Sequence, residues 1–238
     1  VAGSVELITN GILLTEERSR ELIKAGLDML WVSLDGATPE SYADVRLGAA
    51  LPQVLENIRR IAIMRHETAR QPEIGISFVA MRRNIADLPK LIRMGPRLGV
   101  SHFMVSNAFP YTEEICREML YVHSLDAVDS IPSPWSPRID LPLMDMNEGG
   151  QEAILNTLRN RHNVRMNGVP FGQERGQCPF IEGGSIVISW DGNVSPCLAL
   201  MHSYPTYLKG QNRNVRGHVL GNLTGQDLKS IWETPDYV

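Results

Sequence analysis

Two cysteines flank a predicted β-hairpin in the last third of this 238-residue sequence. Cys178 and Cys197 lie on either side of the dipeptide Asp191-Gly192, a pair that favours tight hairpin turns. Thiolates that bracket a hairpin can bind zinc or an iron–sulfur cluster. Two unrelated buried thiols, or a disulfide, are also compatible with this spacing. The cysteines therefore predict either a metal site or a structural pair.

Small polar residues and arginines follow four strand-like segments in the first half of the chain. They are Thr9-Asn10-Gly11, Ser33-Leu34-Asp35-Gly36, Arg82-Arg83-Asn84 and Ser106-Asn107. Functional groups of parallel α/β sheets gather at the carboxyl ends of strands, so these residues would share one rim. They suit a ligand with hydroxyl and carboxylate groups better than a phosphate, because the sequence has no GxGxxG or Walker motif. Any one of them could instead cap a helix or simply reach water.

The elements that would position this rim alternate between strands and helices. Strands are expected at residues 5–9, 30–34, 74–81 and 102–106. Thr15 and Thr38 can cap two of the helices between them, and residues 51–66 and 88–98 have helical apolar spacing. This order predicts parallel pairing through right-handed crossovers. Residues 1–110 should therefore form an α/β domain with at least four parallel strands.

The second half of the chain has a different pattern. Residues 131–142 contain four prolines, which predict an irregular connection, and residues 151–162 are expected to form a helix. A β pattern follows Cys178, and a two-residue turn at Asp191-Gly192 would pair Trp190 with Asn193. A final helix is expected to begin at Thr224.

The composition indicates a folded, soluble protein. The chain is 43% hydrophobic and 21% charged, with a formal net charge of −4. No apolar run approaches the roughly 18 residues of a membrane span, and the mild acidity argues against nucleic-acid binding. Three cysteines and the lack of a signal peptide favour a cytoplasmic protein. Neither end has a polar tail, so we expect a piece of a longer protein.

The order of these motifs resembles that of radical S-adenosylmethionine (SAM) enzymes. Residues 5–11 and 31–36 are similar to the third and fourth strands of that superfamily, and residues 74–84 to its fifth. Cys178, thirteen residues, Gly192, four residues and Cys197 match the opening of the SPASM extension, which carries auxiliary [4Fe–4S] clusters. Residues 190–198 and 201–204 look most like those of maturases of tungsten-cofactor oxidoreductases.

This resemblance implies an α/β architecture in three parts. Residues 1–110 would form a partial (β/α) TIM-type barrel with parallel strands. Residues 111–176 would be an irregular linker with a helix, and residues 177–238 a truncated SPASM- or twitch-like domain containing a small β-hairpin.

The resemblance also implies cofactors and residues that hold them. SAM would bind with Ser33 and Asp35 near its ribose and Asn10 near the floor of the cleft. Arg82 or Asn84 would lie near the SAM carboxylate or the substrate. Cys178 and Cys197 would be ligands of an auxiliary [4Fe–4S] cluster.

Several family motifs would lie outside this sequence. The CxxxCxxC loop of the catalytic cluster and a Gly-Gly-Glu strand would precede Val1, and the later cysteines would follow Val238. Leu198 occupies the position where some relatives carry a catalytic acid, so no catalytic residue is predicted. The chain alone is therefore expected to be inactive and to hold no cluster firmly.

For the intact protein the resemblance implies cleavage of SAM to a 5′-deoxyadenosyl radical that modifies a peptide or protein. The expected partners are that substrate, for example a tungsten-cofactor oxidoreductase, and an electron donor, with neither nucleic acid nor membrane. The alternative is a non-catalytic binding module with a zinc- or disulfide-stabilised hairpin. A TIM-barrel lyase is disfavoured, because no catalytic lysine or metal-ligand set occurs at the strand ends.

Overall fold

The structure is a computed structural model. In it the chain forms two compact units. Unit 1 comprises residues 1–108 and 118–173, and unit 2 comprises residues 109–117 and 174–238. The residues that the structure describes are 3–46, 50–67, 71–120, 138–141, 148–159, 163–166, 169–170, 180, 183–208 and 211–234.

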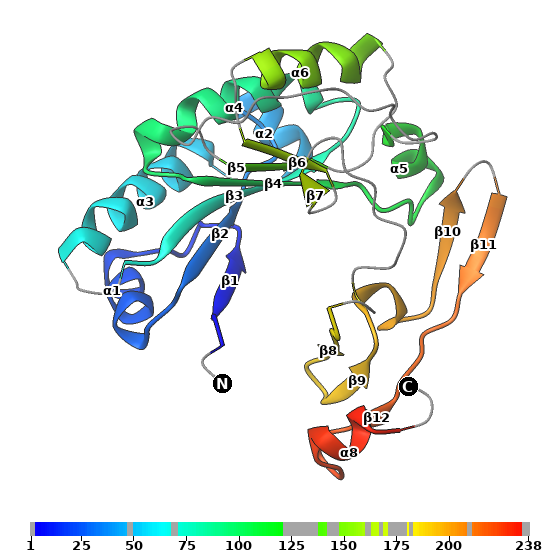
Figure 1. The fold of residues 1–238 in the computed structure, drawn as a ribbon. Coiled ribbons are helices and arrows are strands. Elements are labelled where there is room, and N and C mark those ends of the chain that lie inside the picture. The colour runs from blue at the N-terminus through cyan, green and yellow to red at the C-terminus, as the bar shows by residue number, and fades with distance from the viewer. Residues whose placement is uncertain are drawn as a thin grey trace. The chain divides into compact units, whose positions relative to one another are not determined.

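Unit 1 is built on a seven-stranded sheet whose strands pair in chain order. Its strands are β1 (Glu6–Thr9), β2 (Met29–Ser33), β3 (Glu73–Ala80), β4 (His102–Asn107), β5 (Arg138–Leu141), β6 (Asn163–Met166) and β7 (Val169–Pro170). Strands β1 to β6 are parallel, and β7 is antiparallel to β6. The sheet is curved (Figure 1). The predicted parallel α/β architecture is confirmed.

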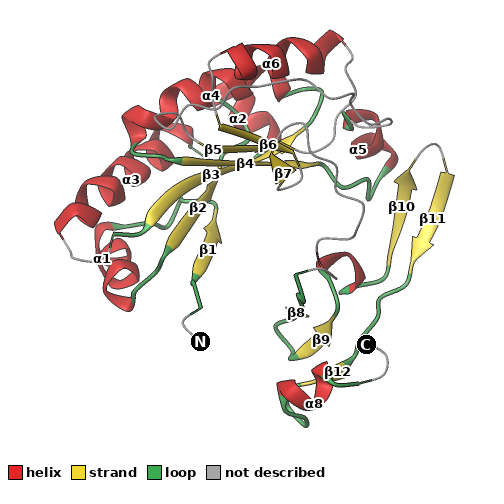
Figure 2. Ribbon diagram, viewed as in Figure 1, coloured by secondary structure: helices red, strands yellow, loops and turns green. Residues whose placement is uncertain are grey.

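Helices cover one face of this sheet (Figure 2). They include α1 (Glu16–Ala25), α2 (Pro39–Val45), α3 (Leu51–Met64), α4 (Leu88–Met94) and α6 (Glu148–Arg159), with short 3₁₀ turns at Arg65–Glu67, Ile85–Asp87 and Gly95–Leu98. Alternate residues of β2 and β3, such as Val32 and Ile76, point into the core under this layer and are fully buried. Val54, Ile58 and Ile61 of α3 are fully buried as well. The core therefore lies between the sheet and its helices.

The helix boundaries follow the local signals of the sequence. Thr15 caps α1 by accepting a hydrogen bond from the Arg18 N–H at 3.3 Å, and Thr38 caps α2 through a capping box with Ser41. The predicted helical segment 88–98 is α-helical up to Met94 and continues as a 3₁₀ turn from Gly95, because Pro96 has no N–H with which to continue the α-helix. These predictions are confirmed.

The expectation that residues 131–142 lack regular structure is wrong for their last part. Strand β5 occupies Arg138–Leu141, between two prolines, and pairs in parallel with both β4 and β6. Ile139 is fully buried. The prolines bound a strand here because none of them lies inside the four paired residues, where a missing N–H would break the ladder.

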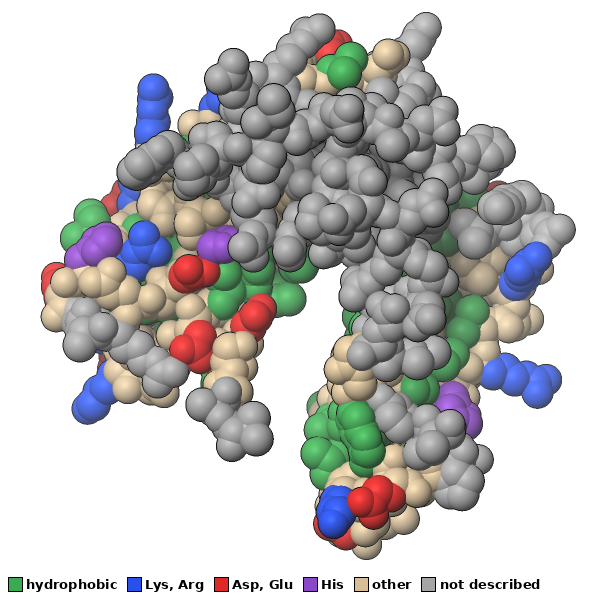
Figure 3. Space-filling model, viewed as in Figure 1, with side chains coloured by type: hydrophobic (Ala, Val, Ile, Leu, Met, Phe, Trp, Pro, Cys, Tyr) green, Lys and Arg blue, Asp and Glu red, His purple; other side chains and the backbone are tan. Residues whose placement is uncertain are grey.

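The first strand of the sheet has a largely exposed edge. Val5 and Ile8 are both 59% exposed, and Leu13, which follows the turn after β1, is 63% exposed. Figure 3 shows hydrophobic side chains next to acidic ones over β1 and β2. A groove of about 640 Å³ lies beside this edge, lined partly by Leu7, Leu14 and Leu22.

Unit 2 contains two small antiparallel sheets. Strands β8 (Val187–Ile188), β9 (Asn193–Ser195) and β12 (Gly221–Asn222) form one, in the order β12-β9-β8. Strands β10 (Tyr204–Leu208) and β11 (Gln211–Val215) form the other. Unit 2 also holds most of α5 (Glu113–Glu118), a 3₁₀ turn at Leu198–Leu200, and α8 (Leu228–Trp232).

The predicted hairpin exists, but its turn is one residue longer than expected. Ile188 pairs with Val194, and the Ser189 N–H donates to the Asn193 carbonyl at 2.9 Å, so Trp190 lies in the turn and does not pair. Gly192 has a φ of 84°, which suits the last residue of a three-residue turn. The Asp191 carboxylate accepts hydrogen bonds from the Ser189 hydroxyl and the Asn193 N–H, which stabilises the longer turn.

The last helix begins later than expected. Its N-cap is Asp227, which accepts from the Ser230 N–H at 3.0 Å, whereas a start at Thr224 was predicted. Aspartate is a strong N-cap because its carboxylate pairs with a free N–H of the first turn. Within the described part of the chain, no helix is long and apolar enough to cross a membrane.

Candidate functional site

The carboxyl ends of strands β1 to β3 form the candidate site of unit 1. Thr9 is level with Val32, so Asn10 follows at the level of Ser33, which pairs with Ser77 of β3. Ser33 lies on the sheet face opposite the buried Val32, away from the helices. Asn10 is exposed, Ser33 is half-buried, and Ser77 is 9% exposed. This carboxyl rim therefore presents small amide and hydroxyl groups side by side.

The turn after β1 is held in place by a residue that the sequence did not single out. Asn57 of α3 is 5% exposed, and its side-chain amide donates to the carbonyls of Gly11 at 2.8 Å and Ile12 at 3.2 Å. Gly11 has a φ of 76°, and a Cβ there would lie 2.8 Å from a Val32 methyl group. An asparagine inside an apolar helix face was the available signal, because a buried amide needs such partners.

Asp35 follows β2 and is 2% exposed. Its Oδ1 accepts from the Val79 N–H at 2.7 Å, and its Oδ2 accepts from the Arg46 Nε at 2.7 Å. Both oxygens thus have partners within the chain. In this arrangement the carboxylate joins the end of β2 to β3 and to the residue that follows α2.

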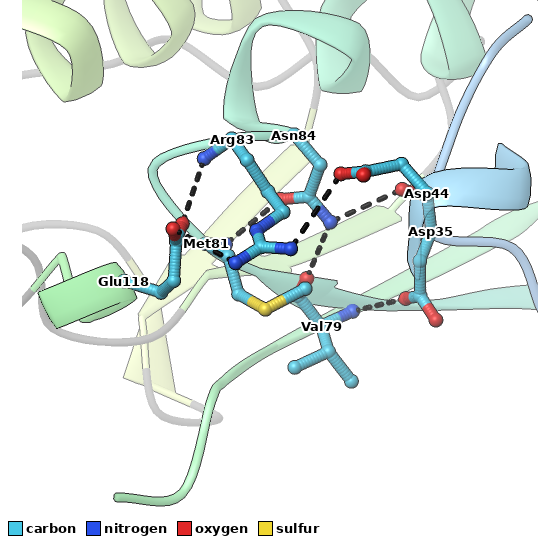
Figure 4. Close-up of polar contacts among 7 residues, drawn as sticks. All are labelled: Asp35, Asp44, Val79, Met81, Arg83, Asn84 and Glu118. Carbon is cyan, nitrogen blue, oxygen red and sulfur yellow. Dashed lines mark hydrogen bonds and ion pairs between the residues drawn. The ribbon is translucent and has the colours of Figure 1, made fainter. Parts of the chain in front are cut away.

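Asn84 lies in the turn after β3 and is also 2% exposed. Its amide nitrogen donates to the carbonyls of Asp35 at 3.1 Å and Val79 at 2.9 Å, and its Oδ1 accepts from the Met81 N–H at 2.8 Å. Figure 4 shows this side chain directed toward Asp35 and Val79. Two of the predicted site residues, Asp35 and Asn84, are therefore in direct contact.

The two arginines of this turn differ in their surroundings. Arg82 is exposed, and its N–H donates to the Glu118 carbonyl at 2.9 Å. Arg83 lies between two carboxylates, with its guanidinium 3.0 Å from Glu118 and 3.6 Å from Asp44 (Figure 4). Burial alone would raise the pKa of Glu118, but the hydrogen bonds from Arg83 outweigh it and the pKa is lowered.

Bulky aromatic side chains lie on the same face of the sheet as the rim, two residues earlier along the strands. Trp31 is two residues before Ser33, and a Cβ on Gly75 would lie 2.3 Å from its indole ring. The indole Nε1 donates to Glu6 at 2.8 Å, and the ring meets His102 edge-on at 6.2 Å between centroids. The small side chains of the rim therefore sit above an aromatic floor, as in the layered interior of a barrel.

In unit 2, Cys197 is a half-buried free cysteine that follows β9, and its backbone is extended. Cys178 lies outside the residues that the structure describes, so its distance from Cys197 stays a prediction. Near Cys197, Tyr204 packs on Phe109 and Tyr111 with ring centroids 5.7 and 5.0 Å away. Burial raises the pKa of Tyr204, with further contributions from Tyr111 and Cys197.

The donor chemistry near Cys197 fits a thiolate-bound cluster. A soft thiolate is the ligand that iron–sulfur clusters use, and the hydroxyl of Ser195, two residues earlier, is fully buried. That hydroxyl has no hydrogen-bond partner among the described residues, although polar groups in protein interiors are normally paired. The same part of the chain brings together no three His, Cys, Asp or Glu side chains that could hold a metal ion.

A family comparison matches the second unit. Residues 178–238 match the model of the SPASM family, described as an iron–sulfur cluster-binding domain. A curated relative from Pyrococcus furiosus, a tungsten-containing aldehyde ferredoxin oxidoreductase cofactor-modifying protein, is 31% identical over 234 residues. The alignment covers 96% of this chain and 59% of the relative, so the chain spans less than two thirds of that protein.

Solved structures share the fold of the whole chain. Streptococcus suis SuiB bound to its precursor peptide SuiA matches with a TM-score of 0.57 at 13% identity, over 98% of this chain and 48% of SuiB. Native anSMEcpe with bound AdoMet matches with a TM-score of 0.52 at 15% identity, over 98% of this chain and 57% of that protein. Together with the SPASM match, these findings confirm the predicted resemblance to radical SAM enzymes with a SPASM extension.

Proposed function

We propose that this chain is the central part of a radical SAM enzyme that modifies a peptide or protein, with unit 1 binding SAM and unit 2 beginning an auxiliary-cluster domain. The carboxyl rim carries the proposal, because its small hydroxyl and amide groups lie above the floor formed by Trp31. Such a surface can hydrogen-bond a ribose or an amino-acid group without steric conflict. The match of residues 178–238 to SPASM supports the second half of the proposal.

Within the rim, we assign contact and positioning to different residues. Ser33, which is half-buried, is proposed to face the ribose of SAM. Asn10, which is exposed, is proposed to face the floor of the cleft. Arg82 is exposed and is proposed to pair with the carboxylate of SAM or the substrate.

Asp35 and Asn84 are proposed to act mainly by holding the strand ends. Their polar side-chain atoms make hydrogen bonds of 2.7–3.1 Å within the chain. The predicted contact of Asp35 with the ribose, or of Asn84 with a carboxylate, would need those bonds to be shared or exchanged.

In unit 2, Cys197 and Cys178 are proposed as two ligands of an auxiliary [4Fe–4S] cluster. The remaining ligands would come from residues beyond this sequence. This cluster is distinct from the catalytic [4Fe–4S] cluster, which the CxxxCxxC loop would hold and which, when bound and reduced, would supply the electron that cleaves SAM to a hydrogen-abstracting radical. The chain's own contribution is to orient SAM and to keep water away from it.

The substrate is proposed to be a peptide or a protein. SuiB is seen with a precursor peptide, and the curated relative is named for modifying the cofactor of a tungsten-containing oxidoreductase. A tungsten-cofactor oxidoreductase is therefore a candidate substrate for this protein too. An electron donor is a necessary second partner, and we propose a cytoplasmic location.

The test is reductive cleavage of SAM by the whole protein that contains this chain. The protein would be loaded with iron and sulfide without oxygen and then given SAM and a chemical reductant. We expect 5′-deoxyadenosine and methionine in equal amounts, measured by liquid chromatography with mass detection. A protein with a full iron complement that leaves SAM intact would contradict the proposal and favour a binding module.

A further inference from the structure

The hydroxyl of Ser195 is a buried polar group whose position calls for an explanation. Ser195 is the last residue of β9 and is 0% exposed. Its Oγ has no hydrogen-bond partner in the part of the chain that the structure describes. A buried hydroxyl without a partner is costly, so its presence points to a group that completes it.

The face of the small sheet on which Ser195 lies can be worked out from its neighbours. Val194 pairs with Gly221, and a Cβ on Gly221 would lie 2.7 Å from Ile231 of α8. Helix α8 therefore packs against the face that carries Val194. Because strand side chains alternate, Ser195 lies on the opposite face, which α8 does not cover.

Ser195 is close to Cys197 along the chain. Two successive peptide units span no more than about 7.6 Å between their outer Cα atoms, so the Cα atoms of Ser195 and Cys197 lie within that distance of each other. Pro196 between them has no N–H, so the residue just before the cysteine cannot donate a backbone hydrogen bond. The Ser195 hydroxyl is the nearest side-chain donor before Cys197 in the sequence.

We propose that the Ser195 hydroxyl donates a hydrogen bond to the auxiliary cluster, either to the Cys197 thiolate or to a cluster sulfide, and thereby raises its reduction potential. This inference rests on the proposed function. Hydrogen bonds to the sulfurs stabilise the reduced cluster more than the oxidised one, because reduction adds negative charge to those sulfurs. Ser195 is then a positioning and tuning residue and takes no part in bond breaking.

The test uses the whole protein, loaded with iron and sulfide without oxygen. Ser195→Ala removes the hydroxyl, and Ser195→Thr retains it. Ser203→Ala is the matched control, because it removes an exposed hydroxyl of the same unit that accepts from the Gly217 N–H. Cys197→Ala identifies which electron paramagnetic resonance signal belongs to this cluster, and a redox titration of that signal gives the potential of each variant.

We expect a more negative potential in Ser195→Ala alone. At a fixed applied potential its ratio of oxidised to reduced cluster should rise roughly three- to tenfold, where tenfold corresponds to about 59 mV for one electron. Metal-free Ser195→Ala should melt no lower than metal-free wild type, since it loses no existing hydrogen bond.

Other outcomes overturn the inference. A fully loaded Ser195→Ala protein with the wild-type potential overturns it and leaves the proposed function intact. A lower melting temperature in the metal-free variant also overturns it, because the hydroxyl would then have a partner in the chain. A wild-type protein whose unit 2 takes up no cluster overturns the proposed function and this inference together.

Discussion

At the scale of single residues, one amide organises the carboxyl rim. Asn84 makes three hydrogen bonds, to the backbone of Asp35, Val79 and Met81, and thereby ties the turn after β3 to the end of β2. No other side chain type offers an acceptor and two donors in so small a volume. The rim thus depends on Asn84, whose side-chain nitrogen and oxygen both make hydrogen bonds within the chain.

Replacing this amide should cost stability. We expect Asn84→Ala to lower the free energy of unfolding by about 2–3 kcal/mol, because it leaves buried backbone groups unpaired. Asn84→Asp should do no better, since a carboxylate oxygen would then face two carbonyls. Urea denaturation measures both variants. The exposed Asn214→Ala should change stability by less than about 0.5 kcal/mol, and an equal effect at the two sites would contradict this role.

The ion pair between Arg83 and Glu118 predicts a pH dependence. The pKa of Glu118 in the folded state is lowered from its ordinary value of 4.5, so the unfolded chain binds the proton more tightly. The stabilisation is therefore fully present above pH 4.5 and is lost as the pH falls through the lowered folded value.

Glu118→Gln tests this pH dependence. We expect the wild type to be more stable than the variant by about 1 kcal/mol at neutral pH. The difference should shrink steadily in acid, as denaturation curves across the pH range would show. A difference that is constant with pH would mean that the carboxylate's charge is not what stabilises this site.

At the scale of elements, the parallel sheet depends on a close fit between neighbouring strands. Gly75 of β3 has no side chain where the Trp31 ring of β2 crosses it, and a Cβ would approach that ring to 2.3 Å. We expect Gly75→Ala to destabilise unit 1 by about 1–3 kcal/mol and to change the tryptophan fluorescence.

Gly225→Ala is the control, because nothing lies within 4 Å of a Cβ at that position. The double variant Gly75→Ala with Trp31→Leu should regain part of the loss, since the smaller side chain makes room. If Gly75→Ala unfolds at the same denaturant concentration as the wild type, the ring does not constrain this strand pair.

The same scale shows how far the sequence could predict the fold. The first four strands were predictable because each is a short, mostly apolar run, and helix caps such as Thr15 and Thr38 mark where the following helices begin. Strand β5 was not, because its four residues lie between prolines and are specified by pairing with β4 and β6. The hairpin turn was misjudged by one residue, because the Asp191 side chain stabilises a longer loop than the Asp-Gly pair alone requires.

For the candidate site, the positions of the residues were predictable from the sequence, but their hydrogen-bond partners were not. Sequence order placed Asn10, Ser33, Asp35, Arg82 and Asn84 at strand ends, but it could not separate exposed residues from those already bonded within the chain. Asn57 was missed because its partners are backbone carbonyls more than 40 residues away. The asparagine within the apolar face of α3 indicates a buried amide, but the sequence does not show which carbonyls the amide bonds.

At the scale of the whole molecule, the proposed function gives the two units different roles. Unit 1 offers a polar rim beside the Trp31 ring. Unit 2 offers the thiol of Cys197 and, two residues earlier in the sequence, a buried hydroxyl that has no partner among the described residues. The central claim is that SAM binds at the carboxyl rim of unit 1. It is independent of the identity of the peptide or protein substrate.

Calorimetric measurement of SAM affinity in the whole protein tests this claim most directly. Ser33→Ala removes a hydroxyl at the rim, whereas Ser101→Ala removes an exposed hydroxyl at the amino-terminal end of β4. We predict that Ser33→Ala weakens SAM binding roughly five- to tenfold, as expected for one lost hydrogen bond, with its unfolding curve unchanged. Ser101→Ala should bind SAM as the wild type does. Equal SAM affinity in the wild type and in Ser33→Ala would contradict the placement of SAM at this rim.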